Sequence, residues 1–245
     1  MADYGSLVAD KAILDLEKQL HRVYLQAAKE LKAKLDMFTK RHAAKAEKKK
    51  ELVKAGQMTE DESKSWLRGQ VFMEKQWKDK VDQATKIISH ANEEAVKIVN
   101  EKKLNVFAEN YNHQAYDLER EIGADMGFNV YNSESVARLI KDDPDILPKW
   151  KVDQKKDYVW NRQKVNNSIT QGIIQGEGVD DIAKRLISNL CTQNENKMRT
   201  FARTSVTGAQ NAGRIEQLHD AEESGIKVKK KWLATLDDRT RDTHR

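Results

Sequence analysis

The chain has 245 residues, of which 34% are charged and 38% hydrophobic, and its formal net charge is +5. Two prolines and one cysteine favour long helices and exclude an internal disulfide. The net charge permits contact with a polyanion. It is too small for the chain length to indicate a domain dedicated to reading DNA, which usually concentrates its positive charge. No apolar run approaches the roughly 20 residues that span a bilayer, and Asp3 and Asp10 do not fit a secretory signal, so we expect no membrane contact.

Residues 1–122 predict a long antiparallel helical hairpin with the character of a coiled coil. The first helix is expected over 6–55, with Ser6 as its N-cap. Gly56 ends this helix, and Thr59 with Glu62 forms a capping box for the second. The apolar stripe of the first helix follows steps of three and four: Ile13, Leu16, Leu20, Val23, Ala27, Leu31, Leu35 and Phe38. At about 1.5 Å per residue, the hairpin should reach roughly 75 to 90 Å.

The second helix is expected to run without interruption over 60–122. Its first half has heptad spacing through Trp77, Val81, Ala84, Ile88, Ala91, Ala95 and Ile98. The seam then continues from Leu104 to Ile122, beyond the reach of the first helix. This second half must therefore pack against the C-terminal part of the chain or against a neighbouring molecule.

The densest positive stretch lies at the end of the first helix, where seven Lys or Arg accompany two Glu between residues 40 and 54. The basic residues surround the helix, which suits sequence-independent contact with DNA phosphates rather than groove readout. The alternatives are a solvated helix end, where the helix dipole favours cations, and a docking face for an acidic protein surface. The DNA-contact candidates are Lys40, Arg41, Lys45, Lys48, Lys49, Lys50 and Lys54.

Residues 123–156 form a connector that glycines and prolines punctuate. Within it we expect a short strand over 128–131 and a short helix over 133–141, with Ser133 as the N-cap. Apolar residues such as Trp150 are too frequent for a disordered linker.

Residues 157–245 predict a smaller helical module with a short β element at its C-terminal end. Helices are expected over 157–175, from Asp180 or Asp181 to about Leu190, and over 194–223. The last of these helices has small residues along one face, which let another backbone approach closely and predict a central position: Ala202, Ser205, Ala209 and Ala212. Gly225 then precedes the predicted β element, over 226–236.

Three further side chains of this module, Cys191, Arg203 and Arg214, are considered for functional roles. Cys191 lies in an apolar helix end and is interpreted as a packing residue. Arg203 and Arg214 lie eleven residues apart on roughly the same side of their helix. Both salt bridges and phosphate contacts fit these two arginines.

An ordered series of motifs closes the chain: Ala202-Arg203-Thr204, the small-residue helix, Gly225, Lys-x-Trp, and Asp-x-Arg-Thr-Arg-x-x-His. This series resembles the head-morphogenesis module of tailed phages, typified by the phage Mu F protein. The resemblance covers roughly 167–245, and in that family the chain continues beyond the histidine, so the module here is incomplete. The residues that the resemblance marks as structural or interaction residues are Arg203, Thr204, Ala209, Trp232, Asp238, Arg239, Thr240, Arg241 and His244.

The resemblance implies a structural minor head protein of a tailed bacteriophage. Such a protein is made in the bacterial cytoplasm, lies inside the capsid near the portal, and helps head assembly and genome packaging or ejection. The implied partners are the portal protein, the major capsid protein and, weakly and without sequence preference, packaged double-stranded DNA. Self-association through the long helices is a further expectation, and a free-standing coiled-coil adaptor is a weaker interpretation.

The alternative is a metal-dependent nuclease or hydrolase that acts through the polar turn Asp237–His244. Two carboxylates and one histidine so close in sequence are a weak metal signal. An Asp-Asp-Arg-Thr turn also satisfies its own backbone through side-chain hydrogen bonds, which favours a structural role. We therefore predict no catalytic residue, no cofactor and no metal ligand, and expect a protein that is not an enzyme.

Overall fold

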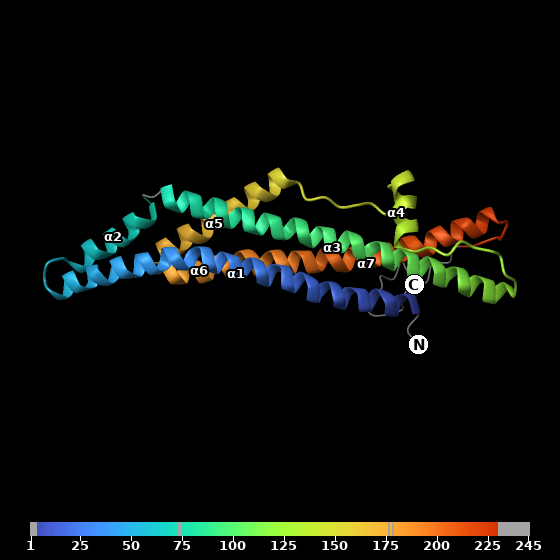
Figure 1. The fold of residues 1–245 in the computed structure, drawn as a ribbon, viewed down its shortest axis with the longest axis horizontal. Coiled ribbons are helices and arrows are strands. Elements are labelled where there is room, and N and C mark those ends of the chain that lie inside the picture. Colours follow the sequence, from blue (N-terminus) through green and yellow to red (C-terminus); the bar gives the residue numbers. More distant parts are fainter. Residues whose placement is uncertain (1–3, 73–74, 176, 178, 230–245) are drawn as a thin grey trace, which may run out of the picture.

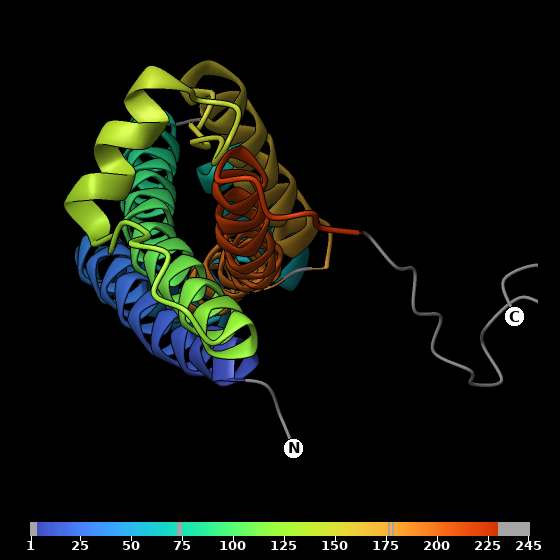
Figure 2. The same cartoon turned by 90° about the vertical axis from the view of Figure 1, so that its right-hand side faces the viewer.

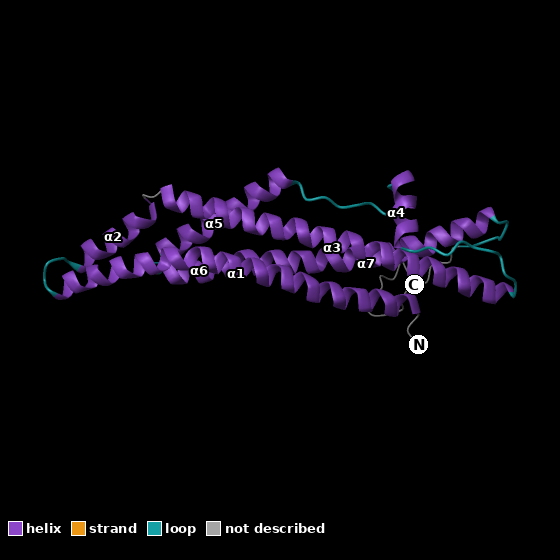
Figure 3. Cartoon of the chain, viewed as in Figure 1, coloured by secondary structure: helices purple, strands orange, loops and turns teal. Residues whose placement is uncertain are grey.

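The computed structural model describes residues 4–72, 75–175, 177 and 179–229 (Figure 1). The described part is mainly helical, as predicted, and contains no strand (Figure 3). The elements are α1 (Tyr4–Lys54), α2 (Glu60–Phe72), α3 (Lys75–Ile122), α4 (Ser133–Asp142), α5 (Gln154–Ile174), α6 (Val179–Ile187), the π-helical turn η1 (Ser188–Thr192) and α7 (Gln193–Glu223).

The structure confirms the predicted turn of the hairpin, with Gly56 at the end of the first helix and a capping box at Thr59 and Glu62. Gly56 has a positive φ of 69°, which costs glycine little, and it closes α1. The Thr59 backbone N–H donates to Glu62 Oε2 at 2.8 Å, and the Glu62 N–H donates to Thr59 Oγ1 at 3.2 Å. This reciprocal pair is the capping box, and it lowers the pKa of the Glu62 carboxyl because the Thr59 N–H stabilises the carboxylate.

Three predicted helix boundaries differ from the structure. α1 already begins at Tyr4, so Ser6 lies inside the helix and is not its N-cap. The second helix is described as two helices, α2 and α3, which lie on either side of residues 73–74. The N-cap of α4 is Asn132 rather than Ser133, because the Asn132 side chain accepts the Ser135 N–H.

The predicted β elements also differ from the structure. Residues 125–132 contain no strand. The segment around Tyr131 instead bonds to the side chain of Asn112 on α3, which accepts the Tyr131 N–H and donates to the Tyr131 carbonyl. Residues 226–229 form no strand, and the rest of the predicted C-terminal strand lies outside the described residues.

Three long helices form an elongated body, with α1 antiparallel to α3 and to α7, and α7 parallel to α3 (Figure 1). With 51 residues, α1 alone spans about 77 Å at the usual rise per residue, in agreement with the expected length. None of the described helices combines the length and the apolarity that a membrane span needs.

Most residues of the predicted apolar seams lie in one continuous core, but Ile122, at the end of the second seam, is 43% exposed. α1 contributes Leu16, Leu20, Leu31 and Leu35, and α3 contributes Val81, Ile88, Ala95 and Phe107. The second half of α3 packs against α7 (Figure 2). The first helix also reaches this half, because Lys102 pairs with Asp15 and the ring of His113 stacks on that of Tyr4. The prediction of an overhang beyond the first helix was therefore wrong over most of this half, whereas the expected packing on the C-terminal part of the same chain is confirmed.

Small residues let α7 lie close to its neighbours. Of the predicted small-residue stripe, Ala202 and Ala209 are buried, whereas Ser205 and Ala212 are only partly buried. Gly213 is also buried on this helix. At Gly213, a β-carbon would lie 2.3 Å from the backbone oxygen of Phe107 on α3. Gly213 was not among the predicted stripe residues, although it lies four residues after Ala209.

Replacing Gly213 with alanine should destabilise the fold. The added carbon meets backbone rather than a flexible side chain, so α7 has to move away from α3, at a cost of about 1–3 kcal/mol. Gly208→Ala is a matched control in the same helix, because a β-carbon there meets nothing within 4 Å. Thermal unfolding followed by circular dichroism should show a lower Tm for Gly213→Ala and an equal or higher Tm for Gly208→Ala, since alanine favours helix. Equal shifts in both variants would contradict the close approach.

Candidate interaction surfaces

Three of the marked motif residues lie on α7, and they have different environments. Ala209 is fully buried in the core. Thr204 is exposed, and its hydroxyl donates to the Thr200 carbonyl oxygen at 3.1 Å. Arg203 is exposed and faces α1. The other marked residues, Trp232, Asp238, Arg239, Thr240, Arg241 and His244, lie outside the described residues, as does the alternative catalytic turn.

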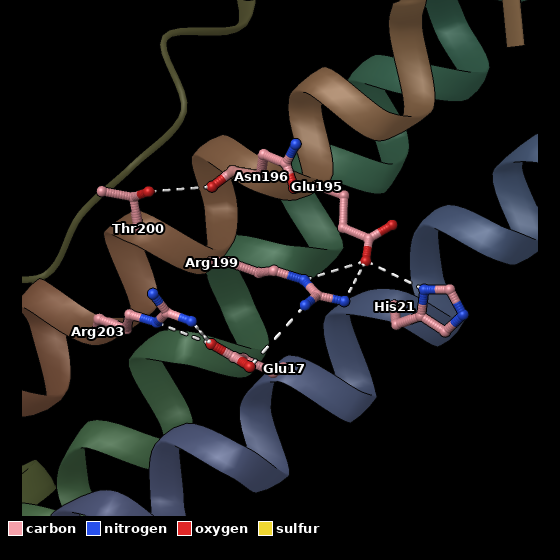
Figure 4. A network of polar contacts seen from close by, with 7 residues as sticks. All are labelled: Glu17, His21, Glu195, Asn196, Arg199, Thr200 and Arg203. Carbon is pink, nitrogen blue, oxygen red and sulfur yellow. Dashed lines mark hydrogen bonds and ion pairs between the residues drawn. The ribbon is translucent and has the colours of Figure 1, made fainter. Parts of the chain in front are cut away.

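Alternating charges join α7 to α1 (Figure 4). Glu17 on α1 accepts from Arg203 Nε at 2.8 Å, and its other oxygen lies 3.9 Å from Arg199. Arg199 also donates to Glu195 Oε1 at 2.6 Å, and this same oxygen lies 3.1 Å from His21 Nδ1 on α1. The Arg203 side chain is 61% exposed, so its pair adds little stability, but the pairing favours the salt-bridge interpretation over phosphate contact.

A buried polar layer crosses α1, α3, α5 and the start of α7. Tyr24 donates to Asn92 Oδ1 at 2.6 Å, and Asn92 donates to Asp157 at 2.9 Å and to Asn194 at 3.3 Å. Asn161 donates to the second Asp157 oxygen at 2.9 Å. Burial, with Asp157 nearby, raises the pKa of the Tyr24 hydroxyl, which stays a donor. Because each group finds its partner in only one alignment, this layer sets the register of the helices.

Cys191 lies in η1 and is a buried, free thiol, in agreement with the packing interpretation. Burial, with Glu195 as a smaller cause, raises its pKa to about 12. Within the described ranges, no group of three or more His, Cys, Asp or Glu side chains is arranged to hold a metal ion.

Comparison with known proteins extends the resemblance to nearly the whole chain. The family described as phage Mu protein F like protein matches residues 163–245. The minor head protein GP7 of Bacillus phage SPP1 is 28% identical over 239 residues, which cover 96% of this chain and 70% of GP7. The chain is thus similar to a phage minor head protein along nearly its whole length, and to the Mu F-like family over its last third.

Part of the chain is also similar to a stretch of a much longer protein whose name gives an enzymatic activity. An NAD(+)–arginine ADP-ribosyltransferase of Enterococcus faecalis is 35% identical over 82 residues, or 34% of this chain and 17% of that protein. No solved structure matches. Because so little of the ADP-ribosyltransferase is covered, this similarity does not assign its activity to this chain.

The basic cluster lies at the end of the body that α1 and α2 form, where α7 does not extend beside them (Figure 1). Lys45, Lys48, Lys50 and Lys54 are exposed. Lys49 is half-buried, with its Nζ 5.6 Å from the centroid of Trp66 on α2. Lys40 and Arg41 belong to α1, but their side chains lie outside the described part. We call Lys45, Lys48, Lys49, Lys50 and Lys54 the basic tip.

Native Cys191 should react slowly with a thiol reagent such as Ellman's reagent. The thiolate is the reacting form, and a pKa raised to about 12 leaves almost none of it at pH 8. We expect labelling at least about a hundredfold slower in the folded protein than in denaturant, where the thiol titrates near 8.5. Rapid native labelling at pH 8 would show that η1 opens readily.

Two fully buried amides on α7 should respond oppositely to apolar substitution. Asn194 belongs to the polar layer, so Asn194→Leu removes the donor to the Asn161 side-chain oxygen and one acceptor of the Asn92 amide, which should cost about 1–3 kcal/mol. Gln217 is 0% exposed, and neither of its amide atoms has a hydrogen-bond partner among the described residues. Gln217→Met removes this unsatisfied amide and should raise stability by up to about 1 kcal/mol. Urea unfolding measures both, and a destabilising Gln217→Met would point to a partner for that amide.

Proposed function

We propose that this chain is a structural minor head protein that lies inside the capsid and associates with the portal. The similarity to the SPP1 minor head protein along 96% of the chain is the observation that carries the proposal. The elongated helical body, without a described metal cluster, fits a component that joins other head proteins and helps head assembly and genome packaging or ejection. The major capsid protein is the other expected protein partner.

We further propose a division of labour within the chain. The hairpin, residues 1–122, is the scaffold, and the connector 123–156 leads to the head-morphogenesis module, 157–245. In support, the family match begins at residue 163, inside α5. The helix α7 of this module packs along both long helices of the hairpin. In this arrangement the scaffold holds the module in a defined orientation.

The charge of the two ends favours contact between the basic tip and packaged DNA. At the opposite end, residues 116–145 contain eight Asp or Glu and only three Lys or Arg. Burial, followed by the neighbouring Asp220 and partly offset by His219, raises the pKa of Glu216 on α7, and Asp143 contributes to the rise. These carboxylates therefore crowd together at the end far from the tip. A polyanion would attract the tip and repel the other end, which orients the body.

Attachment to heads tests the proposed location. Heads assembled without this protein, with and without the portal, are incubated with the purified chain and sedimented. We expect co-sedimentation with portal-containing heads and little with heads that lack the portal. Equal binding to both would contradict portal association, and binding to neither would contradict the role in the head.

Binding of the basic tip to DNA should be weak, independent of sequence and strongly dependent on salt. With three to five phosphate contacts, the slope of log affinity against log salt should be roughly −3 to −4.5. Lys48→Glu with Lys49→Glu should weaken binding and flatten the slope. The matched control, Lys29→Glu with Lys32→Glu, changes the same charge on exposed residues elsewhere on α1 and should have a smaller effect. Fluorescence anisotropy with two unrelated duplexes measures the affinity and its salt dependence. If no binding is detected at low salt, DNA contact is wrong and the tip is a solvated helix end or a protein-docking face.

A further inference from the structure

Two lysines hold their charges against one indole ring on the surface between α5 and α7. Lys164 Nζ lies 3.9 Å from the centroid of the Trp160 ring, and Lys197 Nζ lies 3.5 Å from it. Lys164 and Trp160 are one turn apart on α5, whereas Lys197 is in the second turn of α7. Lys164 also donates to Gln193, so it is held between the two helices.

These two cations lack the usual partner. Among the residues that the structure describes, neither ammonium forms an ion pair with a carboxylate. Burial, followed by the neighbouring Lys197, lowers the pKa of Lys164. The fold therefore holds two like charges close together against their electrostatic repulsion. An anionic group placed beside them would remove that repulsion. The ring also fixes the two long side chains, so less conformational entropy is lost on binding.

The same surface continues to a second, more exposed tryptophan. Trp150 is 47% exposed and packs against Phe201 of α7, with ring centroids 4.5 Å apart. Its backbone is anchored to α3, because Asn100 donates to the Trp150 carbonyl at 2.8 Å and accepts the Trp150 N–H at 3.3 Å. Trp150 therefore has a defined position before any partner arrives. We call Trp150, Trp160, Lys164, Lys197 and Phe201 the tryptophan–lysine surface.

We propose that the tryptophan–lysine surface docks an acidic face of another head protein. Half-exposed tryptophans on a rigid backbone are typical anchors of protein interfaces. The two unpaired lysines select carboxylates on the partner. A phosphate backbone fits less well, because this surface offers two lysines beside half-exposed rings, whereas nucleic-acid binding depends on many phosphate contacts. This surface is separate from the basic tip, and the assignment rests on the proposed function in the head.

Binding to heads tests the tryptophan–lysine surface. Full-length variants are titrated onto heads assembled without this protein, and the bound fraction after sedimentation gives an apparent Kd. Lys164→Gln with Lys197→Gln should weaken binding at least about tenfold, as expected for the loss of two desolvated charges at an interface. Lys29→Gln with Lys32→Gln removes the same charge from α1 and should bind like the wild type. Trp160→Leu should also lose binding, and Trp160→Phe, which keeps an aromatic face, should restore most of it.

Each outcome decides between the proposals. Failure of the wild type to bind heads overturns both the role in the head and this surface. Wild-type binding that the double lysine variant retains overturns only the surface, provided that circular dichroism shows a folded variant. A 30-base-pair duplex is titrated in parallel as the competing ligand. If the double lysine variant loses affinity for the duplex but not for heads, the surface contacts nucleic acid and the protein-docking assignment is wrong.

Discussion

Gly213 lets α7 approach α3 to a distance at which any β-carbon would collide with the Phe107 backbone oxygen. Most of the molecule depends on this approach. Once α7 is seated there, it packs against α3 and α1 together and completes the core along the length of the body. It also places Tyr111 of α3 beside Asp220, to which the tyrosine donates a hydrogen bond. A bulkier stripe would hold the helices apart and leave these contacts unmade.

Apolar packing alone would tolerate a slide of one helix past another, because alanine and valine stripes repeat. The buried layer of Tyr24, Asn92, Asp157, Asn161 and Asn194 removes this freedom, since a slide by one turn would leave several buried polar atoms without partners. The layer lies where four helices meet, near the start of α7. Close packing at Gly213 and polar pairing at Asn194 therefore align α7 at two points about 30 Å apart along the helix.

This alignment holds three surfaces of the body in fixed relative positions. The basic tip lies at one end, carboxylates crowd the other, and the tryptophan–lysine surface lies between them on the side of α5 and α7. The ion pairs between α1 and α7 engage Arg199 and Arg203, so these arginines are less available to an outside anion than Lys164 and Lys197 are.

The sequence alone determined the features that depend on neighbours in the chain. The hairpin turn at Gly56, its capping box, the apolar seams of α1 and α3 and the small-residue face of α7 all follow from local spacing and backbone preference. The positive charge of the basic tip and the motif series that marks the phage head family are likewise visible in the sequence.

Only the tertiary structure decided which side chains meet across helices. Lys164 and Lys197 are 33 residues apart, and nothing in their local sequence indicates that Trp160 lies against both. The same holds for the pairing of Glu17 with Arg203, which are 186 residues apart. Such contacts depend on the register and spacing of packed helices, which arise from many small packing and hydrogen-bonding terms and not from the pattern of any one segment.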